Sequence, residues 1–191
     1  EDETTAAPNA PLFSAQWALK NTGQNQGTAG IDINYLPARE VTQGSSDIIV
    51  AVLDHGTQLD HPDLNVSSKS YDTETGRSPS QISGNHGTAC SGIISAKTNN
   101  NLGVAGIAPN CPVMSISNQL MGTSDAPQKR ADGFNWAWRN GASVISNSWR
   151  SSTFSELLED AIQSAMTNGR NGLGCVVTFS AGNYDSNTVG Y

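Results

Sequence analysis

Residues 48–54 read Ile48-Ile49-Val50-Ala51-Val52-Leu53-Asp54, six apolar residues in a row followed by a carboxylate. An unbroken apolar run rich in β-branched residues is typical of a strand that is buried on both faces of a parallel sheet. We therefore predict a strand over residues 48–53, with Asp54 at its carboxyl end.

Similar runs recur along the chain, and helical patterns separate them. Further strands are predicted at residues 113–116, 143–146 and 175–179, and helices at residues 86–96, 127–140 and 154–168. Strands that alternate with helices of this length indicate an α/β fold. We expect a doubly wound parallel sheet with helices on both faces and right-handed crossovers.

Polar residues gather where three of these strands end. In a parallel sheet, ligand sites lie just beyond the carboxyl ends of the strands. This rule places Asp54, residues 147–150 and residues 180–183 on one rim. The functional site is expected on that rim.

Composition excludes two classes of function. The chain has 191 residues, which suits one domain or a large part of one, and its 17 acidic and 10 basic residues give a net charge of −7. Nucleic-acid binding is not expected, because phosphate contacts need clustered Lys and Arg. No apolar run approaches the length of a membrane span, so none is predicted. The polar start of the chain predicts a flexible N-terminal tail over residues 1–15.

The three cysteines, Cys90, Cys111 and Cys175, carry little functional signal. Their odd count leaves at least one thiol unpaired within the chain. No CxxC pair is present, which argues against zinc. Each lies in an apolar neighbourhood, so we predict three buried, unreactive thiols.

Three residues have the types that serine hydrolysis requires besides the nucleophile. Asp54 ends a buried strand, His86 opens a helix of small residues, and Asn183 follows the last predicted strand. A serine hydrolase needs a base, a carboxylate that orients the base, and a donor for the oxyanion. Taken singly, each also has a structural interpretation, as a turn or capping residue, a structural histidine and a left-handed turn.

Five segments together carry a family resemblance. They are residues 50–56 with 61–64 (VAVLDHG and HPDL), 86–92 (HGTACSG), 103–109 (GVAGIAP), 144–149 (VISNSW) and 179–183 (FSAGN). In this order the chain resembles the subtilisin/kexin family of serine proteases, the subtilases or peptidase family S8. The resemblance implies a subtilisin-like fold in which residues 16–191 form the N-terminal part of the catalytic domain and its C-terminal portion is missing.

The resemblance also assigns catalytic and substrate-binding roles. It implies that Asp54 orients the imidazole, His86 acts as general base and then general acid, and Asn183 donates to the oxyanion. The implied substrate-binding residues are Ser148, Trp149 and Arg150 on one edge, and Met121 and Gly122 on the opposite edge. A polypeptide substrate would add to the first edge as a β-strand. Arg150 stands where the family usually carries Gly, so it either selects acidic substrates or obstructs the groove.

The nucleophilic serine is not expected within this chain. In the family it lies in a Gly-Thr-Ser motif after the oxyanion asparagine, whereas Gly122-Thr123-Ser124 precedes Asn183. Ser124 also stands just before Pro127, as expected where Ser or Asp caps a helix that has Pro in its first turn. We therefore predict that the nucleophile belongs to the missing C-terminal part of the domain, and that the fragment alone is inactive.

A structural calcium site is implied as well. In the family the carboxylate corresponding to Asp63 pairs with an Asn-rich loop, here Lys97 to Val104. The implied ligands are Asp63, Asn100, Lys97, Leu102 and Val104, through carboxylate, amide and backbone oxygens that Ca²⁺ prefers. The plain alternative is a loop that simply ends a helix.

A second metal hypothesis rests on a dense cluster of acidic residues and histidines: Asp54, His55, Asp60, His61 and Asp63. Such a cluster favours a metal-dependent hydrolase. Against it, adjacent residues of an extended strand point to opposite faces, and His61-Pro62 indicates a turn.

The favoured prediction is a secreted or cell-envelope serine endopeptidase of subtilisin type, supported by calcium. It would hydrolyse peptide bonds through an Asp-His-Ser triad that the full-length protein completes. An inactive subtilase-like binding or scaffold domain remains the alternative, since Arg150 and Asn85 depart from the family pattern and no nucleophile is present.

Overall fold

The α/β fold predicted from the sequence is confirmed in a computed structural model, which describes residues 6–151 and 153–183. The strands are β1 (Ile49–Asp54), β2 (Tyr71–Asp72), β3 (Val113–Ser117), β4 (Ala142–Asn147) and β5 (Val176–Phe179). The α-helices are α1 (Tyr35–Val41), α2 (His86–Ser95), α3 (Ala126–Arg139) and α4 (Glu156–Gly172), and short 3-10 helices cover Phe13–Ala15 and Gln24–Gln26. Two elements, α1 and β2, were not predicted.

The five strands form one parallel sheet in the order β2-β3-β1-β4-β5. The strand with the unbroken apolar run, β1, lies at its centre, and Ala51 and Leu53 have no exposed surface. Asp54 pairs in register with Ser117 at the end of β3. The carboxyl ends of β1, β3 and β4 therefore share one rim, as the parallel topology requires.

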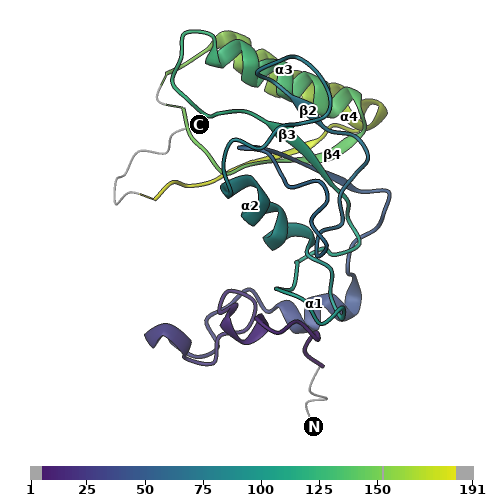
Figure 1. Cartoon of the computed structure of the whole chain (residues 1–191), viewed down its shortest axis with the longest axis vertical. Coiled ribbons are helices and arrows are strands. Elements are labelled where there is room, and N and C mark those ends of the chain that lie inside the picture. Colours follow the sequence, from purple (N-terminus) through teal and green to yellow (C-terminus); the bar gives the residue numbers. More distant parts are fainter. Residues whose placement is uncertain (1–5, 152, 184–191) are drawn as a thin grey trace.

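Helices cover both faces of the sheet, so the predicted double winding is confirmed. Figure 1 shows α3 and α4 together on one face and α2 on the other. The chain passes from β1 through β2 and α2 to β3, then crosses back through α3 to β4 on the other side of β1. Opposite faces of β1 thus support two different layers of helix.

The larger core lies between the sheet and the pair α3 and α4. Phe134 of α3 is fully buried there, packed among Leu53, Met114, Ile116 and Ile145 from three strands. At about 25 cal/mol per Å² of buried apolar surface, this layer is a main source of stability. It fixes the three strands whose ends carry the site.

The opposite face is lined by small residues, which bring α2 close to β1. A Cβ atom on Gly87 would lie 2.4 Å from the carbonyl oxygen of Gly56, so only glycine permits this approach. Deeper in the same contact, the hydroxyls of Ser91 and Thr57 lie 2.7 Å apart, and both residues are buried. Close packing of this kind places His86, the first residue of α2, beside the end of β1.

The N-terminal segment differs from the predicted flexible tail of residues 1–15. Residues 1–5 lie outside the described range. Ala10 and Phe13 are buried in a small second core with Tyr35, and the Leu12 amide donates to the Gly103 carbonyl at 2.9 Å. The prediction rested on polar composition, whereas two apolar side chains are enough to anchor residues 6–15. Among the described helices, none is long and apolar enough to cross a membrane.

Candidate active site

Asp54 supplies a fully buried carboxylate at the carboxyl end of β1. The backbone N–H of His55 donates to its Oδ1 atom at 2.7 Å. Its own carbonyl oxygen accepts the N–H of Asn118, also at 2.7 Å, from the segment that follows β3. Both the carboxylate and the backbone of Asp54 are therefore held in one orientation.

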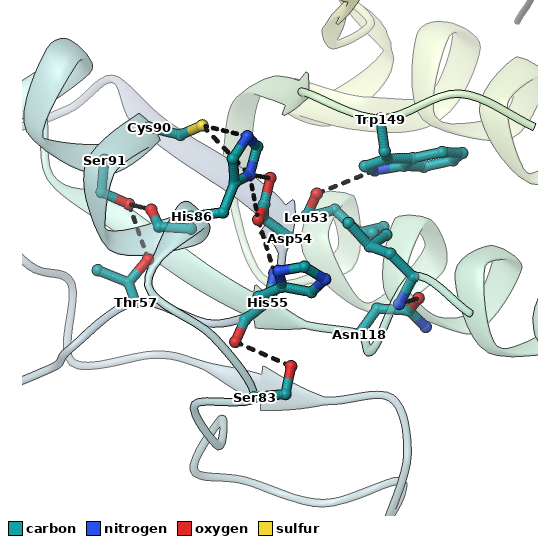
Figure 2. Close-up of polar contacts among 12 residues, drawn as sticks. Leu53, Asp54, His55, Thr57, Ser83, His86, Cys90, Ser91, Asn118 and Trp149 are labelled. Atoms are coloured by element: carbon teal, nitrogen blue, oxygen red, sulfur yellow. Dashed lines mark hydrogen bonds and ion pairs between the residues drawn. The ribbon is translucent and has the colours of Figure 1, made fainter.

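His86 reaches this carboxylate from the first turn of α2 (Figure 2). Its Nδ1 atom lies 2.8 Å from Oδ1 and 2.9 Å from Oδ2 of Asp54. Half of the histidine side chain, 51%, is exposed, while the carboxylate is not. Because an ionised carboxylate can only accept, Nδ1 carries the proton and Nε2 is left with a lone pair. This arrangement suits a general base.

Within the described part of the chain, no serine hydroxyl forms a hydrogen bond with the His86 ring. The contact recorded for Nε2 of His86 is the Cys90 sulfur at 4.0 Å. Ser124 is exposed and lies before the start of α3, as predicted. The predicted capping bond does not form: Asp125 is the N-cap residue, and its carboxylate pairs with Lys129 at 2.9 Å instead of capping the helix.

Cys90 corrects one prediction, because it is only half-buried. It lies one turn after His86, with Sγ 3.8 Å from Nδ1, the nitrogen that Asp54 already holds (Figure 2). Burial raises the pKa of the thiol, a hydrogen bond with Ser148 opposes the rise, and the charge of Asp54 adds to it. Cys90 is therefore a neutral thiol rather than the thiolate of a cysteine–histidine nucleophile. Cys111 and Cys175 are buried, as predicted.

The acidic and histidine cluster predicted for a metal hydrolase does not assemble. Among the described residues, the one group of three that could hold a metal is Asp54, His86 and Cys90. His61 instead accepts the Asp63 amide through Nδ1 at 3.2 Å, within a local turn, and Asp60 is exposed.

His55 contributes to the site in a way that the sequence did not indicate. Its ring lies edge-on to that of His86, with centroids 6.1 Å apart. Its carbonyl oxygen accepts the Ser83 amide at 2.8 Å and the Ser83 hydroxyl at 3.2 Å (Figure 2), and these bonds tie the loop before α2 to the end of β1. Although adjacent residues of an extended strand were predicted to point to opposite faces, both side chains lie beside His86: the Asp54 carboxylate binds Nδ1, and the His55 ring packs against the imidazole.

Asn183 lies on the same rim, after the end of β5. It is exposed and follows Gly182, whose φ of +91° produces the turn there. The amide of Ser180 donates to the carbonyl of Asn147 at 3.0 Å, which extends the pairing of β5 with β4 to this end of the sheet. The sheet thus carries Asn183 to the edge that holds Asp54, as predicted, while its role stays a prediction.

Trp149 follows β4 and is 93% buried, with 7% of its surface exposed. Its indole Nε1–H donates to the Leu53 carbonyl at 2.9 Å, and Phe179 meets its ring edge-on at 5.3 Å. The side chain thus anchors the segment after β4 to β1. Ser148, just before it, is half-buried, and Arg150, just after it, is exposed.

One residue from each predicted substrate edge lines a common cleft of about 620 Å³. Gly122, from the loop after β3, and Arg150, from the loop after β4, both line it. Met121 is exposed beside it. Arg130 of α3, which the sequence did not single out, lines the cleft as well. Its position in the apolar stripe of α3, four residues before Phe134, was the signal available in the sequence.

The predicted calcium ligands come together in part. The carboxylate of Asp63 is 5% exposed, and its Oδ1 accepts the Asn100 side-chain amide at 2.7 Å. The Asp63 carbonyl accepts the Lys97 amide at 2.7 Å, and Asn100 accepts the amide of Leu102 at 3.1 Å. Val104 is half-buried in the same loop. Lys97 points its ammonium group to the Pro62 carbonyl.

Two observations fit a cation at Asp63. No Lys, Arg or His in the described residues forms an ion pair with this buried carboxylate, although a buried charge needs compensation. Gly103 has a φ of +43°, and a Cβ atom there would lie 2.4 Å from Oδ2 of Asp63. The loop backbone thus curls against the carboxylate, where its carbonyl oxygens can complete an oxygen shell for Ca²⁺.

Comparisons with known proteins identify the family. The model of the subtilase family matches residues 45–191. The chain is 34% identical to a calcium-dependent protease of Nostoc sp. over 90% of its length, and 35% identical to a thermophilic serine proteinase of a Bacillus species over 96%. A solved structure, the serine protease of Aeromonas sobria in complex with a chaperone, matches 96% of the chain with a TM-score of 0.78 and 26% identity.

The match covers a minor part of each of these relatives. The chain spans 28% of the Nostoc protease, 45% of the Bacillus proteinase and 33% of the Aeromonas chain.

Proposed function

The chain belongs to the subtilase family, and on this premise we propose that it supplies the base and its carboxylate to a serine endopeptidase. The observation that carries the proposal is the bond from His86 Nδ1 to the buried carboxylate of Asp54 at 2.8 and 2.9 Å. A buried carboxylate in this position holds the histidine in one tautomer and stabilises the imidazolium that forms during catalysis.

The reaction is peptide-bond hydrolysis through an acyl-enzyme. A serine supplied by sequence outside these 191 residues gives its proton to Nε2 of His86 and attacks the scissile carbonyl carbon. Asp54 stabilises the positive imidazolium, and the Asn183 side-chain amide donates to the oxyanion of the tetrahedral intermediate. His86 then returns the proton to the departing amine, and water repeats the sequence to release the acyl group.

The substrate is a polypeptide that adds as a strand between the segments 120–122 and 148–150. The segments follow β3 and β4, the two strands on either side of β1, and they flank one cleft through Gly122 and Arg150. Main-chain hydrogen bonds to an added strand bind many sequences, and side chains directed into the cleft supply the selectivity.

Calcium is proposed as a structural ion. The residues that would hold it are Asp63 and Asn100 through their side chains, and Lys97, Leu102 and Val104 through their carbonyl oxygens. Bound there, the ion supplies positive charge to a buried carboxylate that has no ion-pair partner in the described residues. Two relatives of 34% and 33% identity are named calcium-dependent proteases. Secretion or a cell-envelope location of the whole protein stays a prediction.

A binding or scaffold domain without catalysis is the second candidate. Arg150 favours it, because a long exposed cation lines the cleft at the substrate edge. The two candidates differ in one property, the presence of a nucleophile activated by His86.

A fluorophosphonate probe tests the proposal, because it labels only activated serines. The full-length protein is expected to be labelled at a serine outside residues 1–191, and His86→Ala is expected to abolish the labelling. An unlabelled protein with an intact fold would decide for the scaffold. Labelling of Ser124 would show that the nucleophile lies within this chain.

A further inference from the structure

Arg130 is a buried cation that the proposed mechanism does not use. It is 6% exposed, although arginine is seldom buried without a partner. Its Nη2 donates to the Met121 carbonyl at 3.3 Å, and its Nε–H has no hydrogen-bond partner among the residues that the structure describes. No Asp or Glu in residues 6–151 and 153–183 forms an ion pair with it.

The aromatic ring of Trp149 compensates this charge only in part. The guanidinium carbon lies 4.8 Å from the ring centre, within the range of a cation–π contact. Burial lowers the pKa of Arg130, as expected where no carboxylate opposes the desolvation. Arginine stays protonated at any physiological pH, so the charge persists and its Nε–H remains unsatisfied.

The cleft beside Arg130 has the chemistry of an anion site. Its volume is about 620 Å³, and Arg130 and Arg150 both line it. Four hydroxyl side chains, Thr123, Ser124, Ser151 and Thr153, also face it, and no Asp or Glu is among its described lining residues. The whole chain has a net charge of −7, whereas the charged residues among the described lining of this cleft are both cations.

We propose that this cleft binds an acidic side chain, Asp or Glu, of the polypeptide substrate, and that Arg130 is the residue that selects it. The proposal rests on the proposed function, in which the substrate lies between the segments 120–122 and 148–150 that flank the cleft. A carboxylate at this position supplies the counter-charge that the guanidinium lacks among the described residues, and the planar fork of arginine suits two oxygens at once.

The position of the cleft favours a substrate side chain as its occupant. Alternate side chains of an added strand point to the same face, so one or two of them point toward the cleft. Both arginines line the cleft, Arg150 exposed and Arg130 buried, so an entering carboxylate meets two cationic side chains.

The first test needs only the wild-type full-length protein. Internally quenched octapeptides carry Glu or Gln at each position in turn, and kcat/KM is measured for each pair. We expect Glu to be preferred over Gln by about tenfold at one or two positions, because charge-assisted hydrogen bonds contribute more than neutral ones. Equal cleavage of every pair would overturn the proposal while leaving the protease intact.

Arg130→Met and Arg130→Lys then locate the preference. The Glu/Gln ratio is expected to fall to about one in Arg130→Met and to be retained in part in Arg130→Lys. Arg139→Met is the matched control, since Arg139 lies on the same helix and stacks on Trp138 at 5.1 Å, but does not line the cleft. A ratio that survives Arg130→Met, or that falls equally in Arg139→Met, would contradict the assignment.

A binding measurement separates this inference from the proposed function. Fluorescein-labelled Glu and Gln peptides are titrated into the His86→Ala protein, and anisotropy reports the dissociation constants without any cleavage. If no peptide is cleaved by the wild type but the Glu peptide still binds about tenfold more tightly, the protease proposal fails and the anion cleft stands. Equal binding of the two peptides counts against the cleft alone.

Discussion

The indole of Trp149 donates its Nε1–H to the carbonyl oxygen of Leu53 at 2.9 Å (Figure 2). Leu53 immediately precedes the catalytic candidate Asp54, and Trp149 belongs to the proposed substrate edge. One hydrogen bond between buried residues thus joins the carboxylate that orients His86 to the segment that would receive substrate. The guanidinium carbon of Arg130 lies 4.8 Å from the centre of the same ring. The end of β1 at Asp54, the proposed substrate edge and Arg130 therefore all depend on the position of this ring.

Trp149→Phe is expected to lower the free energy of unfolding by about 1–3 kcal/mol. The change removes the donor and leaves the Leu53 carbonyl buried without its partner, which costs about that much. Urea unfolding of the full-length protein in a His86→Ala background, which prevents self-cleavage, measures the effect.

The control for this prediction is Trp138→Phe. Trp138 also donates through Nε1, to Asn135 at 3.2 Å, but both residues are only half-buried and water can replace the bond. Its loss is expected to be less than half as large. Equal losses at the two positions would show that ring size matters and that the bond to Leu53 does not.

Asp54→Asn is expected to lower kcat of the full-length protease by about 10⁴-fold with its fold intact. An amide no longer requires the proton of His86 to lie on Nδ1, so the base is presented in the wrong tautomer. Steady-state cleavage of a casein-derived peptide measures kcat, and thermal unfolding checks the fold.

Asp60→Asn is the matched control, because Asp60 is exposed and near in sequence. Its kcat is expected to stay within about twofold of the wild type, as for most surface substitutions. A comparable loss at both positions would favour the metal-dependent hydrolase that groups Asp54 with Asp60.

The strands could be predicted because local signals specify them, whereas the pair Asp54 and His86 was predicted from the family resemblance. A run of buried β-branched residues is a strand whatever surrounds it, and parallel strands bring their carboxyl ends to one rim. The helix that begins at His86 consists of small residues, which indicated that it packs closely. Topology then brings a carboxylate and an imidazole together from residues 32 apart in sequence.

What the sequence missed depends on contacts between distant segments. The composition of residues 6–15 is typical of a tail, but the Asn9 backbone amide donates to the side chain of Asn99, 90 residues away in sequence. Arg130 lies in the apolar stripe of α3, but that stripe does not reveal its contact with Trp149, which comes from another segment. Cys90 lies in an apolar stretch, but it follows His86 by one turn of α2, so its sulfur lies 3.8 Å from Nδ1 of that half-exposed side chain. No local pattern encodes these arrangements.

Removal of calcium is expected to destabilise the full-length protein through Asp63. With calcium at about 100 times its dissociation constant, a chelator should lower the free energy of unfolding by about 3 kcal/mol. Asp63→Asn is expected to abolish the calcium dependence, because the buried charge that the ion neutralises is gone. Unfolding in calcium and in chelator measures both, with Asp60→Asn as the control that keeps the dependence. Loss of stability in chelator that persists in Asp63→Asn would place the ion elsewhere.

Cys90 is expected to react slowly with iodoacetamide near neutral pH. Only the thiolate is alkylated, and burial raises the pKa of this thiol, so the reactive form accumulates at higher pH than for an ordinary cysteine. Mass spectrometry of the Cys90 peptide, across a range from about pH 6 to pH 10, should show a rate that rises only above the usual thiol pKa of about 8.5. The protein in denaturing urea is the reference. Fast alkylation at the acid end of the range would indicate a thiolate paired with His86.

Asn183→Ala is expected to lower kcat of the full-length protease by about 10²–10³-fold with little change in KM. The side-chain amide is proposed to donate to charge that develops only in the transition state, so its removal leaves ground-state binding nearly intact. Cleavage kinetics with saturating and limiting peptide separate kcat from KM. Asn110→Ala is the control, since Asn110 is exposed and its recorded bond, to Gln43, uses only its backbone amide. An increase in KM with unchanged kcat would instead make Asn183 a substrate-binding residue and would leave the oxyanion without this donor.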